Sequence, residues 1–154
     1  MPIKQTTPKA AIQSQLEQMA QQARNEVIIR LAYIGEQVVN EARGYNGKAY
    51  QDQTGNLRSS TGYVIVEDGR VLSVSDFSKV APKNDPEGKA GKGSTTGKAY
   101  AKSLAANFPQ GLTLIVVAGM RYAAYVSAKG YNVLDSAESL AKRLVPEMIK
   151  KLRS

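Results

Sequence analysis

The chain has 154 residues, of which 21 are lysine or arginine and 13 are aspartate or glutamate, so its formal net charge is +8 at pH 7. This length suits one domain with a hydrophobic core, and the positive charge favours an acidic partner such as a nucleic acid or an acidic protein surface. Cysteine and histidine are absent, which excludes disulfides and thiolate metal sites and removes the commonest metal ligand and general base. We therefore expect a protein that is not an enzyme and that has no cofactor.

No apolar run approaches the roughly 20 residues that a membrane-spanning helix needs. Residues 1–5 also lack the hydrophobic core of a signal peptide. The expectation is a soluble protein without a membrane partner.

The first predicted element is a single amphipathic helix from about Pro8 to Arg43. Thr7 can cap its first amides, and proline suits the first helical position. Apolar side chains recur at steps of three or four residues, namely Ile12, Leu16, Met19, Ala23, Val27, Leu31, Ile34, Val38 and Ala42. An unbroken helix of this extent would be about 50 Å long, so part of it is expected to extend beyond the domain and touch another subunit. The alternative is a core helix with no such role.

Two glycines of this region carry their own predictions. Gly35, inside the helix, marks either a bend or a close packing contact. Gly44 follows the helix and suits a left-handed cap.

A β-hairpin is predicted from residues 61–67 and 70–75, because Asp68 and Gly69 between them readily adopt the positive φ of a type I′ turn. Neither face of this hairpin is polar, since Tyr63 and Ile65 alternate with Val64 and Val66. The hairpin must therefore be covered on both sides by helices, by neighbouring subunits or by both. The preceding stretch, residues 54–60, is typical of a turn with Leu57 as an apolar anchor.

A flexible loop rich in lysine and glycine is predicted from about residue 78 to 98. Few apolar residues lie between Pro82 and Gly97, so the segment cannot offset its own ordering entropy. It superficially resembles a phosphate-binding loop, but serine follows Gly93 where that motif needs lysine. The loop is expected either to contact an anion or a partner, or to be merely solvated. The lysines expected to bind a partner are Lys83, Lys89, Lys92 and Lys98.

A short helix is predicted for residues 99–108, which Pro109 would end. Residues 111–119 are the most apolar stretch and are predicted to be the central strand of a sheet, paired with the hairpin. The last element is a helix that begins at a capping box in residues 135–138, and Pro146 is expected to kink it.

Residues 120–131 are predicted to form a short helical turn or bend with basic and aromatic side chains, namely Arg121, Tyr122, Tyr125, Lys129 and Tyr131. Such side chains bind phosphates and stack on bases. Tyrosines at this spacing are equally natural in a core or a subunit interface. Sequence-specific DNA recognition has no support, because neither a recognition helix nor a zinc module is visible.

After the long helix come, in order, Thr54-Gly55-Asn56-Leu57-Arg58-Ser59-Ser60 before the hairpin, Val117-Ala118-Gly119 at the end of a strand, and Tyr122-Ala123-Ala124-Tyr125-Val126 before the last helix. In this order, the stretches resemble the minor tail-component family of long-tailed bacteriophages, the tail-completion or head-tail joining proteins. The resemblance covers nearly the whole chain except the lysine and glycine loop. It departs at residues 127–131, which lack the glutamate and threonine usual in that family.

The resemblance implies an α+β fold in which a small, mainly antiparallel sheet is flanked by the long N-terminal helix and the C-terminal helix. It implies a structural protein of the virion, made in the bacterial host cytoplasm, that sits at the head-proximal end of the tail and completes it or joins it to the head. The expected assembly is a homo-oligomeric ring, with a hexamer favoured, in contact with other neck and tail proteins and with no small-molecule substrate. The residues expected at the interface are Leu57, Arg58, Arg121, Tyr122 and Tyr125.

Within such a ring, the lysine and glycine loop would reach either an acidic neighbouring ring or the DNA that passes through the lumen. Both surfaces attract lysine through their negative charge. The alternative function is that of a basic nucleic-acid-binding protein that acts on phage or host DNA.

Overall fold

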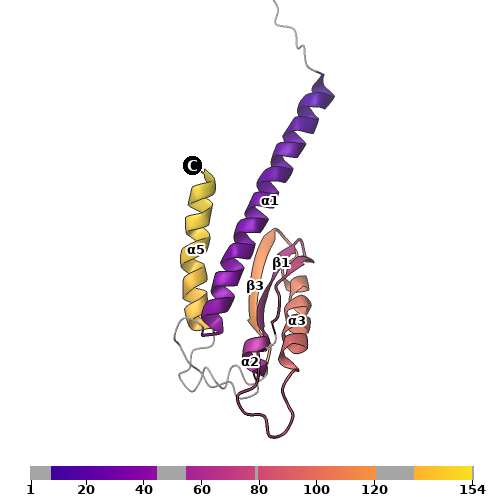
Figure 1. Ribbon diagram of the computed structural model, residues 1–154. Coiled ribbons are helices and arrows are strands. Elements are labelled where there is room, and N and C mark those ends of the chain that lie inside the picture. Colours follow the sequence, from indigo (N-terminus) through magenta and orange to yellow (C-terminus); the bar gives the residue numbers. More distant parts are fainter. Residues whose placement is uncertain (1–7, 45–54, 79, 121–133, 154) are drawn as a thin grey trace, which may run out of the picture.

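The structure is a computed structural model that describes residues 8–44, 55–78, 80–120 and 134–153. Its central layer is a three-stranded antiparallel sheet (Figure 1). The long N-terminal helix and the C-terminal helix lie on one face of the sheet, and a shorter helix lies on the other. This arrangement confirms the expected α+β class with an antiparallel sheet flanked by helices.

Helix α1 spans Lys9–Ala42, so the prediction of one long helix is confirmed. Gly44, with a φ of 75°, is in the left-handed region as expected for the residue that ends a helix. The buried residues of α1 are all in its C-terminal part, namely Leu31, Ile34, Gly35, Val38, Val39 and Ala42. Residues 8–23 are all exposed, and this end projects beyond the sheet and beyond the C-terminal helix (Figure 1). The expected overhang of the helix is thus confirmed.

Strands β1, Thr61–Glu67, and β2, Arg70–Val74, form the predicted hairpin. Asp68 and Gly69 have φ values of 50° and 80°, and both are positive as a type I′ turn requires. The turn is also tied to the next strand, because the Gly111 amide donates to the Asp68 carboxylate at 2.8 Å. The Asp68 amide in turn donates to the Gly111 carbonyl at 3.0 Å.

Strand β3, Leu112–Ala118, pairs antiparallel with β1, and the strand order is β2-β1-β3. The prediction that this most apolar stretch is the central strand is therefore wrong: β1 is central and β3 lies at an edge. The reason is that β1 has two apolar faces. Tyr63 and Ile65 are buried on one side of the sheet and Val64 and Val66 on the other, and none of the four is more than 4% exposed. A strand of this kind gains most from a neighbour on each edge and a helix on each face.

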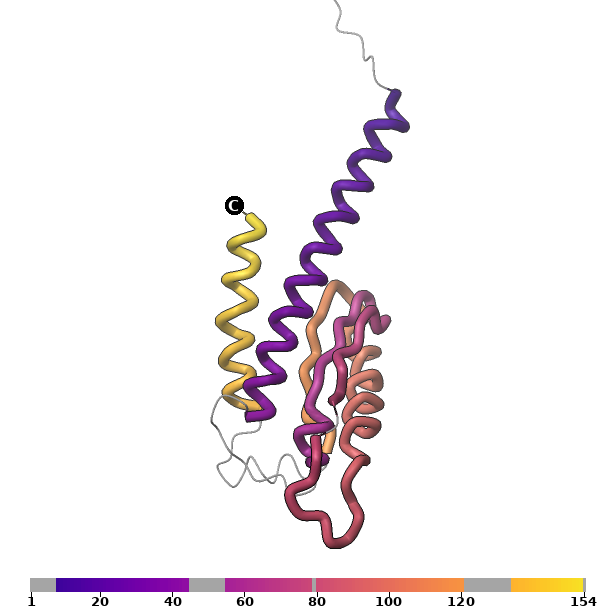
Figure 2. The backbone as a smooth tube through the Cα atoms, viewed as in Figure 1, coloured from indigo at the N-terminus to yellow at the C-terminus, as the bar shows by residue number. Residues whose placement is uncertain are grey.

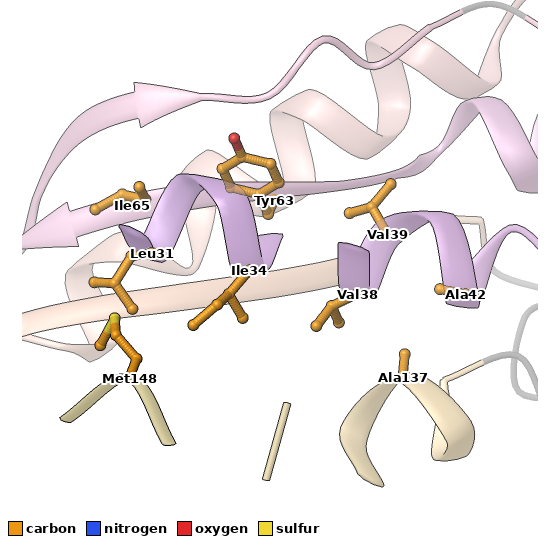
Figure 3. Close-up of a cluster of buried hydrophobic side chains, with 9 residues drawn as sticks. All are labelled: Leu31, Ile34, Val38, Val39, Ala42, Tyr63, Ile65, Ala137 and Met148. Carbon is orange, nitrogen blue, oxygen red and sulfur yellow. The ribbon is translucent and has the colours of Figure 1, made fainter. Parts of the chain in front are cut away.

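Two hydrophobic clusters lie on the two faces of the sheet. The first joins α1 and β1 to helix α5, Asp135–Arg153. Figure 3 shows its buried members, Leu31, Ile34, Val38, Val39, Ala42, Tyr63, Ile65, Ala137 and Met148. The second joins the strands to helix α3, Gly93–Ser103, and to the short 3-10 helix η1, Ala105–Asn107. Helices of the same subunit therefore cover both faces of β1, which is one of the three arrangements that the lack of a polar face predicted, whereas Leu72 of β2 is 42% exposed.

The segment rich in lysine and glycine differs from its prediction. Helix α3 begins at Gly93, whereas a loop to residue 98 and a helix from Ala99 were expected. Lys98 consequently lies on a helix and not in a loop. Among the described residues of the predicted loop, Ser78 and residues 80–92 are irregular. Residues 80–92 project at the end of the molecule opposite to the free end of α1 (Figure 2).

Helix α5 continues through Pro146 to Arg153. The proline removes one backbone hydrogen bond without ending the helix. Asp135 and Glu138 lie in the first turn and three basic residues lie in the last, which is the distribution that the helix dipole favours. The Glu138 carboxylate pairs with Lys142 Nζ at 2.6 Å.

Candidate functional site

The N-terminal part of α1, residues 9–23, carries three of the large apolar side chains that are exposed among the described residues; we call it the α1 arm. Its apolar side chains are Ile12, Leu16, Met19 and Ala23, which lie on one side of the helix because they follow at steps of four, three and four residues. Ile12 is 39% exposed, Leu16 61% and Met19 65%. Val27 and Leu31 continue the same apolar stripe into the hydrophobic core, while the stripe turns by about 60° around the helix over fifteen residues. The stripe by which α1 packs inside the subunit is therefore uncovered in the arm.

An ion pair between Arg24 and Glu67 lies where the arm leaves the body. Arg24 Nε donates to Glu67 Oε1 at 2.8 Å, and Arg24 Nη2 donates to Glu67 Oε2. Because Glu67 ends β1 beside the hairpin turn, the pair joins the middle of α1 to the tip of the hairpin. The hydrogen bonds from Arg24 lower the pKa of the Glu67 carboxyl, and the Glu67 carboxylate raises the pKa of Arg24.

An apolar groove of about 500 Å³ lies between β3, α1 and α5. One wall consists of Leu112, Leu114 and Val116 of β3, and the other includes Ala137, Ala141 and Val145 of α5. Helix α5 packs chiefly on α1, and α1 lies between α5 and the sheet (Figure 1). The three β3 side chains are consequently only half-buried. The groove is a further apolar surface that the described part of the subunit leaves partly uncovered.

Asn56 lies at the start of the short helix α2, Asn56–Ser59. It holds residues 80–92, which we call the lysine segment, to the rest of the subunit. Asn56 Oδ1 accepts hydrogen bonds from the backbone amides of Lys92 and Gly93, both at 3.1 Å. Asn56 Nδ2 donates to the Lys89 carbonyl at 2.7 Å. The two amides lie at the start of α3, where a phosphate-binding loop would hold its anion. Both amides donate to Asn56 Oδ1 instead, so the hydrogen bonds of this segment do not support its likeness to a phosphate-binding loop.

Asp85 closes the same segment internally. Its carboxylate accepts hydrogen bonds from the amides of Lys89 at 2.7 Å and Ala90 at 2.9 Å. The backbone around residue 89 is therefore hydrogen-bonded both to the segment itself and to Asn56. These bonds compensate for the small number of apolar contacts that the composition of the segment provides.

Small residues bring α3 against α2 and the start of β1. A Cβ at Gly93 would lie 2.1 Å from the Asn56 carbonyl oxygen, and a Cβ at Gly97 would lie 2.2 Å from the Ser60 carbonyl oxygen. The buried small residues of this face recur every four positions, at Gly93, Gly97, Ala101 and Ala105. From composition alone, Gly93 and Gly97 were predicted to be loop residues. The four-residue spacing of small residues is the sequence signal that indicates a closely packed helix.

The lysines expected to bind a partner are Lys83, Lys89, Lys92 and Lys98, and all four are exposed. The first three belong to the irregular segment 80–92, and Lys98 belongs to α3. Lys89 pairs with Glu87, and this hydrogen bond raises the pKa of the Lys89 ammonium group. Tyr100 is also exposed on α3.

The predicted interface residues have different positions. Leu57 is completely buried, so its side chain packs inside the subunit and is not available to a partner in this conformation. Arg58 Nε donates to the Arg43 carbonyl at 2.9 Å, and Arg43 Nη2 donates to the Thr61 carbonyl at 2.7 Å. Leu57 and Arg58 therefore contribute to the body of the subunit. Arg121, Tyr122 and Tyr125 lie outside the described residues.

Within the described ranges, no group of three or more aspartate or glutamate side chains is placed to hold a metal ion. No helix in the same ranges is both long and apolar enough to cross a membrane.

Comparisons of the chain with protein-family models, with curated proteins and with solved structures give no match. The features that stand out are surfaces, namely the α1 arm, the groove and the lysine segment.

Proposed function

We propose that this chain is a non-enzymatic structural protein of a long-tailed bacteriophage that completes the tail or joins it to the head as one subunit of a ring. The observation that carries the proposal is the exposed apolar stripe of the α1 arm. A single subunit leaves Leu16 and Met19 mostly in water, and an exposed apolar surface of this kind marks a protein-protein contact. Neighbouring subunits of a closed ring would cover the stripe in every copy.

The lysine segment supports the second part of the proposal, contact with another component of the particle. Segment 80–92 projects at the end opposite to the α1 arm, so both surfaces are accessible at once (Figure 2). Its exposed lysines suit an acidic neighbouring ring or the phosphates of DNA in the lumen. In this account, the protein resides in the neck of the virion and its partners are other neck and tail proteins.

The proposal is tested by disrupting the gene in the phage that carries it and examining the lysate by electron microscopy. We expect filled heads and separate tails, with joined particles restored when the wild-type protein is supplied in trans. Joined, infectious particles in the absence of the protein would contradict the proposal.

A second candidate, a basic nucleic-acid-binding protein, is favoured by the net charge of +8 and by the exposed Tyr100 on the helix that carries Lys98. Lysines bind phosphates and a tyrosine ring stacks on a base. A steep fall in DNA affinity with rising salt, together with absence of the protein from virions, would favour this candidate.

A further inference from the structure

We infer that the α1 arm of one copy docks in the groove between β3 and α5 of a second copy. The inference specifies the subunit contact of the proposed ring and rests on the proposed function only for the place of that ring in the virion. It joins two surfaces of the same chain, an apolar helix without a covering layer and an apolar groove without an occupant among the described residues.

The first argument is the pattern of the arm. Its apolar residues, Ile12, Leu16, Met19 and Ala23, have the same spacing as Val27, Leu31, Ile34 and Val38, which lie fifteen residues further along the helix. The second set packs against the sheet and α5 of its own subunit. The arm therefore repeats the pattern with which α1 already contacts these two elements, and β3 and α5 form the walls of the groove.

The second argument is size. The arm, residues 9–23, is about 22 Å long at 1.5 Å per residue. Strand β3 has 7 residues, which extend over about 23 Å. An amphipathic helix that presents side chains at positions i, i+4 and i+7 is the usual occupant of an apolar groove of these dimensions.

The third argument is the stability of the arm. Residues 9–23 are all exposed in the single subunit. Most of the stability of a helix in a protein comes from the packing of its apolar face, so docking would stabilise the arm.

The main alternative is that the arms of two copies pair with each other, and the observations favour this arrangement less. The stripe of the arm covers only about two heptads, whereas a coiled coil needs at least three or four. Pairing of arms would also leave the side chains of β3 uncovered. Docking of an arm in a groove uses two different surfaces, and such a heterologous contact generates a ring where the rotation from one copy to the next closes.

Cysteine pairs test the contact directly, since the chain has no cysteine of its own. Leu16→Cys places a thiol on the stripe, and Ala141→Cys places one in the groove. We expect the oxidised mixture of these two variants to form a disulfide-linked dimer of one copy of each, while neither variant forms a dimer alone. Ser14→Cys, on the opposite side of the arm, is the matched control and should not join to Ala141→Cys.

Sedimentation of the full chain measures the strength of the same contact. Leu16→Glu combined with Met19→Glu should weaken self-association at least about 100-fold. At a concentration where the wild type is also monomeric, the thermal midpoint should be unchanged, because both side chains are largely exposed in the single subunit. The control, Ser14→Glu combined with Gln21→Glu, adds the same charge on the opposite side and should associate like the wild type.

Two results would overturn the inference. One is a wild-type chain that remains monomeric, and the other is a Leu16→Cys variant that dimerises alone while its mixture with Ala141→Cys gives no joint product. Failure of the proposed function is separate, because the predicted cross-link in a protein that is absent from virions would refute the function and leave the contact standing. A copy number of about six or twelve per virion without the predicted cross-link would support the function and refute the contact.

Discussion

Gly35 of α1 lies directly against the ring of Tyr63 in β1, and a Cβ at position 35 would be 2.8 Å from two of the ring carbons. This confirms the expectation of a close packing contact at Gly35. The same burial raises the pKa of the Tyr63 hydroxyl to about 12, and Glu36 contributes to the increase. Because the contact sets the distance between α1 and the sheet, it also sets the line along which the α1 arm projects.

The first prediction concerns Gly35→Ala. In an exposed helix this change stabilises by about 1 kcal/mol, but here the new methyl group overlaps the Tyr63 ring near its base. We expect the free energy of unfolding in urea to fall by about 1 to 3 kcal/mol. In the background of Tyr63→Leu, which removes the ring, the same change should cost less. A stabilised Gly35→Ala variant would contradict the contact.

The second prediction concerns the pH dependence of the Arg24–Glu67 pair. Hydrogen bonds from Arg24 hold the pKa of Glu67 below its ordinary value of 4.5 in the folded chain. The pair therefore stabilises the fold at pH values above the pKa of the unfolded chain, and this contribution is lost as the pH falls through the lower folded pKa. We expect stability to fall less between pH 7 and pH 3, measured by urea denaturation, in Glu67→Gln than in the wild type.

Arg24→Gln removes the same pair from the other side, so it should flatten the pH dependence in the same way. The double variant should add little to either single change, because one shared interaction is lost in all three. Identical pH profiles of Glu67→Gln and the wild type would show that the pair makes no contribution.

The third prediction concerns Asn56, whose side chain bonds to the backbone at three residues of the lysine segment and α3. Asn56→Ala should lower the free energy of unfolding by about 1 to 3 kcal/mol, because buried groups lose their partners. It should also speed tryptic cleavage after Lys89 and Lys92. Asn56→Asp keeps the acceptor for the two amides and loses the donor, so an intermediate result is expected. Wild-type stability and cleavage in Asn56→Ala would refute the role.

The fourth prediction concerns the exposed lysines. Replacing Lys89, Lys92 and Lys98 together with glutamate should abolish joining of heads and tails, because an acidic partner surface would be repelled. The fold should remain intact, as measured by circular dichroism, since these side chains are exposed. The matched control replaces the same three with arginine, which keeps the charge and should join normally. An undiminished yield of infectious particles from the glutamate variant would sink this claim.

The elements that the sequence predicts correctly are those with a local signal. The three- and four-residue spacing of α1 extends over nine apolar positions, and Asp68-Gly69 specifies a hairpin turn by its own backbone preferences. The overhang of α1 also followed from length alone. The predicted order of the long helix, the hairpin, the third strand and the last helix is correct for the same reason.

The incorrect predictions concern features that depend on tertiary contacts and not on the local sequence. The edge position of β3 depends on which strand can be buried on both faces, and β3 is more apolar than β1 without being the more deeply buried strand. The start of α3 depends on Gly93 and Gly97 approaching the backbone of other elements, which composition presents as loop. The groove could not be predicted, because it results from the packing of α5 on α1 instead of on the sheet. The hydrogen bonds of Asn56 join residues more than thirty positions apart, beyond any local pattern.

The central claim, a ring of this protein in the neck of a virion, is tested most directly by counting the protein in purified particles. Quantitative mass spectrometry against the major tail protein gives this number. A copy number of about six or twelve per particle is predicted, because a closed ring contains a fixed small number of subunits. Absence of the protein from purified virions would contradict the claim.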